Sequence, residues 1–281
     1  MSALPESPRS RLVHGERRPL SAVERTWGLV GFHLTLLRRT WRGLVVSRFL
    51  TPVLFLAAMG IGIGRLVDRS SGGVAGVPYL QYVVPGIVMA SAMQWAVGES
   101  TWPVMTLIKW NQMYAAMLAA PTRVADVLRA HWVVVSFGIA WGSGVFIAIA
   151  ALFGGVRSWW ALLGVPIAVL TAMAFVAPLF WFAARTDNEE GFTTIFRLVS
   201  TPLMLFSGTF FPVSQLPIWL QPVAWVTPLW HGTELARPAF LGDPLDPGHG
   251  AGWAIHLAVL TAYVVVGGWG AHRAFRARLE A

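Results

Sequence analysis

Few residues of this chain have the type and spacing that enzyme chemistry requires. Its 281 residues include no cysteine, and its seven histidines form no i,i+4 pair beside carboxylates of the kind that binds zinc on a helix. Neither a G-x-x-x-x-G-K-S/T phosphate loop nor a G-x-S-x-G nucleophile elbow occurs. The single lysine, Lys109, follows Leu107 and Ile108 instead of a glycine loop. The sequence therefore predicts no catalytic residue, no metal site and no cofactor bound by this chain.

Two charged side chains, Glu99 and Arg197, lie within strongly apolar runs. If these runs cross a membrane, each charge lies about 7–8 Å inside the inner surface, because a helix rises about 1.5 Å per residue. A lone charge at that depth costs on the order of a few kcal/mol. We therefore expect the two to pair, or both to face a central cavity near a substrate headgroup. In the alternative interpretation, Arg197 reaches the interface with its long side chain and Glu99 pairs with Arg48.

The composition indicates a membrane protein. Of the residues 56% are hydrophobic, only 12% are charged and 15 are tryptophan, which is well outside the range of soluble domains. A nucleic-acid-binding role is disfavoured because the arginines are not interleaved with a soluble fold. The glycine repeat from Gly60 to Gly64 lies inside an apolar run, which favours close helix packing over a dinucleotide-binding loop.

Six apolar runs are long enough to cross a bilayer, for which a helix needs about 20 residues. The sequence thus predicts an all-α membrane protein with six transmembrane helices in one domain, residues 44–272. The expected spans are Leu44–Leu66, Gln81–Val104, Trp132–Phe153, Trp159–Ala184, Phe192–Phe211 and Trp253–Ala271.

The distribution of basic residues predicts the orientation. Sixteen lie in the tails and in the loops after the second and fourth spans, whereas four lie in the loops on the other side. Cytoplasmic loops carry the excess of Lys and Arg. We therefore expect a multi-pass protein of the plasma (inner) membrane with both termini, including the tail 273–281, in the cytoplasm.

The N-terminal region divides into two parts. Residues 1–20 are rich in proline, arginine and polar residues, which predicts disorder. Residues 21–43 predict an amphipathic interfacial helix that begins with a capping box at Ser21 and Glu24. The alternative is a frayed start of the first span. The apolar stripe consists of Val23, Trp27, Val30, Leu34, Leu37, Trp41 and Leu44, and the residues off it include Arg25, His33, Arg38, Arg39 and Arg42.

The loop Thr106–Ala130 predicts a short helix that projects into the cytoplasm. Tyr114–Ala120 is apolar, Pro121 ends it, and Thr122 is suited to cap the next helix. Such a projection can dock in a groove of a partner and transmit motion, although short helices in loops also serve packing alone. The candidate coupling residues are Tyr114, Met117, Leu118, Pro121, Thr122, Arg123, Asp126 and Arg129.

The stretch Phe206–Arg237 is apolar but interrupted by four prolines at intervals of five or six residues. No single helix can run through it, and unpaired backbone cannot face lipid. We expect a re-entrant helical pair in the outer leaflet, with an ordinary external loop packed on the bundle as the alternative. The candidate exit-gate residues are Trp219, Trp230, His231, Glu234 and Arg237. The last three recur every three residues, which predicts that they line one helical face; helix capping and a surface role are the alternative for them.

Several motifs make the chain similar to a known family. It resembles the permease subunits of type-2 ABC exporters, in the branch of the nodulation-factor export protein NodJ and the daunorubicin-resistance permeases. The motifs are GEST at Gly98–Thr101, YAAMLAAPTRVADVL at Tyr114–Leu128, LFSGTFFPVSQLPIWLQ at Leu205–Gln221 and PLWHGTELARP at Pro228–Pro238.

The resemblance implies six spans, an amphipathic connecting helix, a cytoplasmic coupling helix and a re-entrant pair before the last span. It also implies two permease copies, identical or homologous, and two ABC ATPase subunits that bind ATP and Mg²⁺. The substrate path would run along the first, second and fifth spans, with Glu99, Arg197, Phe206, Phe210 and Phe211 as candidate lining residues.

The expected function is the membrane subunit of an ATP-driven exporter that works by alternating access. Its apolar path favours an amphiphilic cargo such as a lipid, a glycolipid or a hydrophobic drug, and membrane lipids surround it. The alternatives are an intramembrane lipid-modifying enzyme, which would need clustered carboxylates or histidines, and a passive channel, which would need no ATPase.

Overall fold

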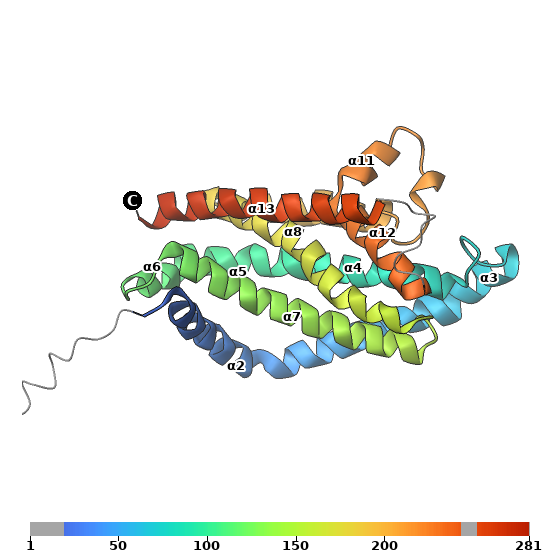
Figure 1. Ribbon diagram of the computed structural model, residues 1–281, viewed down its shortest axis with the longest axis horizontal. Coiled ribbons are helices and arrows are strands. Elements are labelled where there is room, and N and C mark those ends of the chain that lie inside the picture. The colour runs from blue at the N-terminus through green and yellow to red at the C-terminus, as the bar shows by residue number, and fades with distance from the viewer. Residues whose placement is uncertain (1–19, 243–251, 281) are drawn as a thin grey trace, which may run out of the picture.

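The computed structural model describes residues 20–242 and 252–280 of the chain as an elongated bundle of helices (Figure 1). The start of α2 (Ala22–Ala57) and the end of α13 (Gly252–Leu279) lie at one end of the bundle. The helices α3 (Arg65–Ser71) and α11 (Gln221–Val226) lie at the opposite end. The tail expected to be disordered lies, apart from Leu20, outside the described residues.

Four helical segments of the described chain are long and apolar enough to cross a membrane. They agree with the second, third, fourth and sixth predicted spans, so the all-helical membrane architecture is confirmed in this coarser form. The segments are Tyr79–Trp110, which joins α4 (Tyr79–Ser100), α5 (Trp102–Met105) and η2 (Thr106–Trp110); Val124–Leu152, which is α7; Trp159–Arg185, which joins η3 (Trp159–Leu163) and α8 (Gly164–Arg185); and Gly252–Leu279, which is α13.

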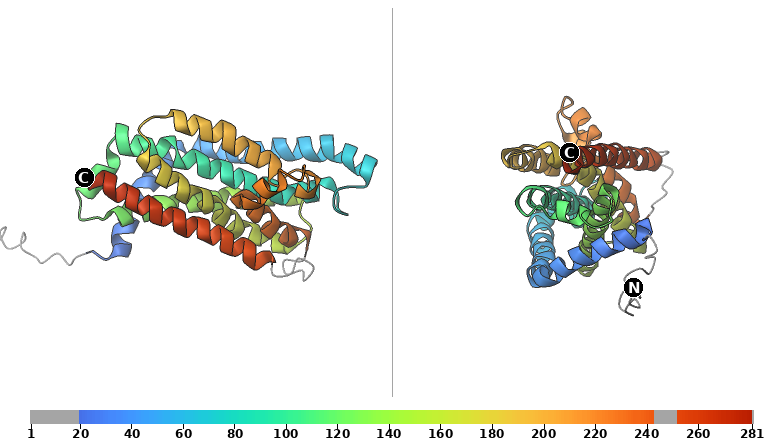
Figure 2. Two further views of the ribbon diagram at one scale, coloured as in Figure 1. Left: turned by 90° about the horizontal axis from the view of Figure 1, so that it is seen from above. Right: turned by 90° about the vertical axis from the view of Figure 1, so that its left-hand side faces the viewer.

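The first predicted span lies within one unbroken helical stretch, residues 22–71, formed by α2, η1 (Ala58–Gly64) and α3. The predicted capping box begins it: Ser21 N donates to Glu24 Oε2 at 2.7 Å, and Glu24 N donates to Ser21 Oγ at 3.2 Å. Figure 2 shows the first part of α2, in dark blue, running across the bundle and its later part running along it. The interfacial position of the first part stays a prediction, and most side chains at 36–52, including that of Arg48, are outside the described part.

The fifth predicted span is shorter than expected. The helical segments α9 (Glu190–Thr194), η4 (Ile195–Ser200) and α10 (Thr201–Phe206) follow one another and end at Phe206 instead of Phe211. The chain turns at Gly208, which has φ +77, a conformation that favours glycine. The sequence reasoning missed this stop because the aromatic residues Phe210 and Phe211 follow so closely that the apolar run seemed to continue through them.

The stretch interrupted by prolines folds into short pieces, as predicted. They are η5 (Val213–Gln215), α11 and α12 (Pro228–Leu241). Pro222 and Pro228 occupy first-turn positions of α11 and α12, where a helix needs no donor from the backbone. α12 packs on the bundle, whereas α11 projects from it (Figure 1).

The core is held by close contacts between helices. A Cβ atom on Gly270 of α13 would lie 2.3 Å from Trp181 Cδ2 of α8, and one on Gly267 would lie 2.6 Å from Pro178. These glycines let the two helix backbones approach, which is how helices associate in lipid. Phe180 of α8 and Phe275 of α13 stack beside them with ring centroids 5.9 Å apart.

Three segments of π-helix occur in the described chain: η1, η2 and η4. η1 and η4 lie within the predicted first and fifth spans, whereas η2 directly follows the predicted second span. Such turns are rare and often mark functional sites. The glycines of the repeat Gly60–Gly64 differ in their surroundings. An added Cβ on Gly60 would lie 3.4 Å from Leu80 Cδ2 of α4, Gly62 has nothing within 4 Å, and Gly64 faces Met59 O of its own helix at 2.6 Å. Of the three, Gly60 fits the predicted contact between helices best.

Candidate coupling site and outer gate

The short helix that the sequence predicts in the loop after the second span is α6 (Met113–Leu118), at the same end of the bundle as the start of α2 (Figure 1). It is entered through Gln112, whose φ of +47 is uncommon outside glycine and turns the chain sharply after η2. Tyr114 and Met117 are buried against the bundle. The spacing of three residues places both on the inner side of α6.

The outer surface of α6 and of the turn after it consists of small apolar side chains. Its exposed residues are Ala115, Ala116, Ala119, Ala120 and Pro121. Two of the predicted coupling residues, Tyr114 and Met117, are large apolar side chains that the structure buries inside this chain. The alternation of large and small residues in YAAMLAAP was the signal, because large apolar side chains pack inward first. We call the exposed set Ala115, Ala116, Ala119, Ala120 and Pro121 the alanine surface.

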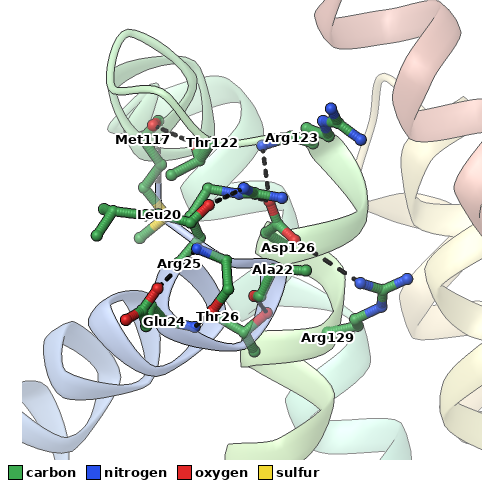
Figure 3. A network of polar contacts seen from close by, with 11 residues as sticks. Leu20, Ala22, Glu24, Arg25, Thr26, Met117, Thr122, Arg123, Asp126 and Arg129 are labelled. Atoms are coloured by element: carbon green, nitrogen blue, oxygen red, sulfur yellow. Dashed lines mark hydrogen bonds and ion pairs between the residues drawn. The ribbon is translucent and has the colours of Figure 1, made fainter. Parts of the chain in front are cut away.

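The junction between α6 and α7 differs from the prediction at one residue. Thr122 does not cap α7; its hydroxyl donates to Met117 O at 2.7 Å and so closes the end of α6 (Figure 3). The N-cap position belongs to Arg123, whose backbone N–H donates to Asp126 Oδ2 at 3.1 Å. A carboxylate at the third helical position can satisfy this backbone group, which leaves the threonine free for α6.

A buried ion pair fastens α2 to the start of α7. Arg25 Nε lies 2.7 Å from Asp126 Oδ2, with side-chain exposures of 14% and 1% (Figure 3). Arg129, also predicted as a coupling residue, lies with Nη1 3.7 Å from Asp126 Oδ1 and is largely exposed. Sequence reasoning assigned Arg25 to the lipid headgroups because it lies off the apolar stripe, but the structure turns that side of α2 toward α7.

Most of the stripe residues whose side chains the structure describes face outward. Val23, Trp27 and Leu34 are exposed, whereas Val30 is buried. His33, expected off the stripe on the polar side, is buried as well. The exposed members are available to lipid, and the buried ones explain why α2 is held against the bundle.

A second buried polar contact holds α6 from inside. Tyr114 Oη and His131 Nδ1 of α7 are 2.6 Å apart, and the His131 ring lies 4.9 Å from the His33 ring of α2, centroid to centroid. Burial raises the pKa of the Tyr114 hydroxyl, so it stays protonated and can donate to the imidazole. Sequence reasoning did not connect these residues, because they are far apart in the chain.

The candidate path residues do not gather around one point. Trp95 Nε1 donates to Glu99 Oε1 at 3.2 Å within α4, and Arg197 is exposed on η4. The ring of Phe210 lies 6.3 Å from that of Phe55 in α2, Phe206 is partly exposed, and Phe211 packs against the small cluster around Val213. The Glu99–Arg197 pairing and the shared lining role stay predictions.

The loop between the fourth and fifth predicted spans is held from two sides. Arg278 Nη1 of α13 donates to the backbone oxygens of Ala184 and Thr186, and its Nη2 lies 2.8 Å from Asp187 Oδ1. Lys109 Nζ donates to Asp187 O at 2.8 Å. Asp187 therefore ties this loop to the end of α13.

The candidate gate residues of α12 divide between two contacts. Arg237 Nη1 binds Glu234 Oε1, Arg237 Nη2 donates to Gly208 O at 2.6 Å, and the guanidinium carbon lies 4.2 Å from the ring centroid of Tyr82 in α4. His231 Nδ1 lies 2.7 Å from His256 Nδ1 of α13, and the Trp230 ring packs on both imidazoles. Trp219 is exposed, before α11. The three residues His231, Glu234 and Arg237 therefore do not line one open face.

Comparison with known proteins identifies the family. A family model described as "ABC-2 type transporter" matches residues 25–241. The chain belongs to the ABC-2 type transporter family. Both α6 and the Arg25–Asp126 pair lie within the matched range, as do the residues of α12.

Curated relatives of this ABC-2 chain agree with that assignment. It is 31% identical to Nodulation protein J of Rhizobium leguminosarum bv. viciae over 79% of its own length and 82% of the relative's. It is 29% identical to Nodulation protein J of Rhizobium meliloti strain 1021, over 79% and 81% of the two chains. It is 27% identical to the Inner membrane transport permease YadH of Escherichia coli K12, over 70% and 77%.

Membership of this family explains why the chain has four helices long and apolar enough to cross a membrane. An ABC-2 type chain is a transmembrane transport subunit, and its family implies an ABC ATPase partner. The resemblance found from the sequence motifs is thus confirmed, both for the family and for its similarity to Nodulation protein J.

Proposed function

We propose that this chain is the membrane subunit of an ATP-driven exporter, coupled to a separate ATPase through the alanine surface of α6. The observation that carries the proposal is the way α6 is built. Tyr114 and Met117 anchor it internally, and the Arg25–Asp126 pair fixes the segment that follows. The alanine surface is small and apolar, so it suits a groove on a partner. Because α6 is held firmly, the surface moves together with the bundle.

The proposed assembly contains two permease copies, identical or homologous, and two ATPase subunits that bind ATP and Mg²⁺. The chain would sit in the plasma (inner) membrane with α6 and both termini in the cytoplasm. The excess of arginine at that end supports this orientation, and the printed name of the YadH relative includes an inner-membrane location. No role for nucleic acid enters the proposal.

The proposed mechanism is alternating access. ATP-driven closure of the ATPases displaces α6, and the movement passes through Tyr114 and Asp126 into α7 and α2. The π-helical turns η1, η2 and η4 supply local places where three helices can change shape. The cargo is an amphiphile, since the helices that the path would follow present largely apolar side chains to membrane lipids and to one another.

The natural absence of cysteine allows a direct test by single-cysteine cross-linking. We expect Ala116→Cys to form a cross-link with a co-expressed ATPase subunit that carries a cysteine in its docking groove. Ile218→Cys is the matched control and should give no cross-link. Ile218 is 83% exposed and comes just before α11 in the chain, and α11 lies at the opposite end of the bundle from α6. Purified complex should also show ATPase activity that cargo stimulates.

Two results would contradict the proposal. One is transport by the purified chain in liposomes without any ATPase, which would favour a channel. The other is unchanged coupling after the alanine surface is replaced by bulky charged residues in a chain that still folds.

A further inference from the structure

An unusual cluster of unpaired polar atoms lies where α12, α4 and the turn after α10 meet. Four buried atoms there have no hydrogen-bonding partner among the described residues. They are Tyr82 Oη, Thr209 Oγ1, Thr233 Oγ1 and Arg237 Nε. A buried polar group that is left unpaired is destabilising, so four at one junction require an explanation.

The contacts around Arg237 show that these residues converge. The guanidinium lies on the ring of Tyr82 and donates to Gly208 O, next to Thr209 in the chain. The backbone of Thr209 in turn lies against Gly86 of α4, where an added Cβ would come within 2.7 Å of Thr209 Cα. Thr233 lies one turn before Arg237 on the same side of α12.

All four atoms can donate a hydrogen bond, and Arg237 Nε belongs to a permanently charged guanidinium. A ligand that matches them must present several acceptor oxygens and a negative charge. In this structure the chain itself provides part of that match, because the Glu234 carboxylate and the Gly208 carbonyl bind the two terminal nitrogens of Arg237.

We propose that this junction is a binding site for the anionic headgroup of the cargo, a phosphate or carboxylate, and that Glu234 occupies it when α12 is closed on α4. The proposal rests on the export function and adds to it a substrate class, an anionic amphiphile. Movement of α12 away from α4 exposes the three hydroxyls and Arg237 together. The headgroup then replaces Glu234 beside Arg237. This exchange frees α12 and the short segments before it to move, and the cargo can leave.

The hydroxyls permit a test that separates binding from structural support. If they are unpaired in the closed state, Tyr82→Phe, Thr209→Val and Thr233→Val will leave the unfolding temperature unchanged or raise it. The same variants should weaken binding of dodecyl phosphate several-fold, measured by titration of the purified chain in phosphatidylcholine nanodiscs. A structural role predicts the opposite pattern, a lower unfolding temperature with unchanged binding.

Substitutions of the two charged residues, Arg237 and Glu234, should change the binding affinity in opposite directions. Arg237→Met should abolish binding of dodecyl phosphate, whereas Glu234→Gln should strengthen it, because the internal competitor loses its charge. Inorganic phosphate and dodecyltrimethylammonium are the control probes and should bind at least tenfold more weakly. If Arg237→Met does not fold, Thr233→Val and Glu234→Gln still decide the result.

Equal binding of dodecyl phosphate by all variants would overturn the site. Equal affinity for inorganic phosphate would overturn the assignment to a headgroup. The titration uses the permease without any ATPase, so its failure leaves the exporter proposal standing. Conversely, failure of the Ala116→Cys cross-link would leave the binding result intact.

Discussion

At the scale of single residues, Asp126 is the residue on which most contacts of the coupling region depend. Its carboxylate binds Arg25, the backbone of Arg123 and, more loosely, Arg129. Removing one partner of a buried ion pair is costly, because the other charge stays buried without compensation. This carboxylate therefore fastens the start of α7, which follows α6 in the chain, to α2.

We predict that Asp126→Asn lowers the free energy of unfolding by about 3 kcal/mol, the range for a broken buried pair. The matched control is Glu280→Gln, which breaks the exposed Arg276–Glu280 pair and should change stability by less than about 1 kcal/mol. Thermal unfolding in detergent measures both. Adding Arg25→Met to Asp126→Asn should recover part of the loss, and a further loss would contradict the explanation by an unpaired charge.

At the scale of helices, the packing of α13 on α8 depends on glycines that admit no side chain. Gly270 lies against Trp181 and Gly267 against Pro178, both closer than a Cβ atom tolerates. In contrast, Gly28 of α2 has open space around it. The same substitution should therefore have opposite effects at these positions.

We predict that Gly270→Ala lowers stability by about 1–3 kcal/mol, because α13 must move away from Trp181. Gly28→Ala should raise it by about 0.5–1 kcal/mol through helix propensity alone. Unfolding temperatures of the two purified variants compare these effects. A stable Gly270→Ala variant would mean that α13 does not pack on α8 as described.

At the scale of the whole molecule, the two ends of the bundle differ in chemistry. One end carries α6, the buried Arg25–Asp126 pair and the basic end of α13, where Arg276 and Arg278 lie. The other carries α3 and α11, and the residues just before α11 include the exposed apolar side chains of Ile218 and Trp219. The proposed orientation places the first end in the cytoplasm.

We predict that a membrane-impermeant maleimide labels Ile218→Cys in intact cells and labels Ala116→Cys only after permeabilisation. The unaltered chain, which has no cysteine, is the control for background. Labelling is measured by gel shift. The reverse pattern would place α6 outside and would remove the basis for coupling to a cytoplasmic ATPase.

The sequence by itself determined the membrane class, four of the helices that can span a bilayer, the capping box at Ser21 and the break-up of Phe206–Arg237 by proline. Each of these features depends on a local pattern. The length of an apolar run determines whether it can span a bilayer, the capping box pairs backbone N–H groups at a helix start, and proline lacks the N–H that a continuous helix needs. The motifs also sufficed for the family, because they lie in the segments that carry its similarity.

Only the tertiary structure decided which side chains meet. It paired Arg25 with Asp126, joined Tyr114 to His131, turned Met117 inward and exposed the alanines of α6. It also ended the fifth helical stretch at Phe206 and gathered Tyr82, Thr209, Thr233 and Arg237 at one junction. In an apolar chain, local pattern shows that a helix is buried in lipid or protein, but not which neighbour it contacts, since lipid tails and core side chains are equally apolar.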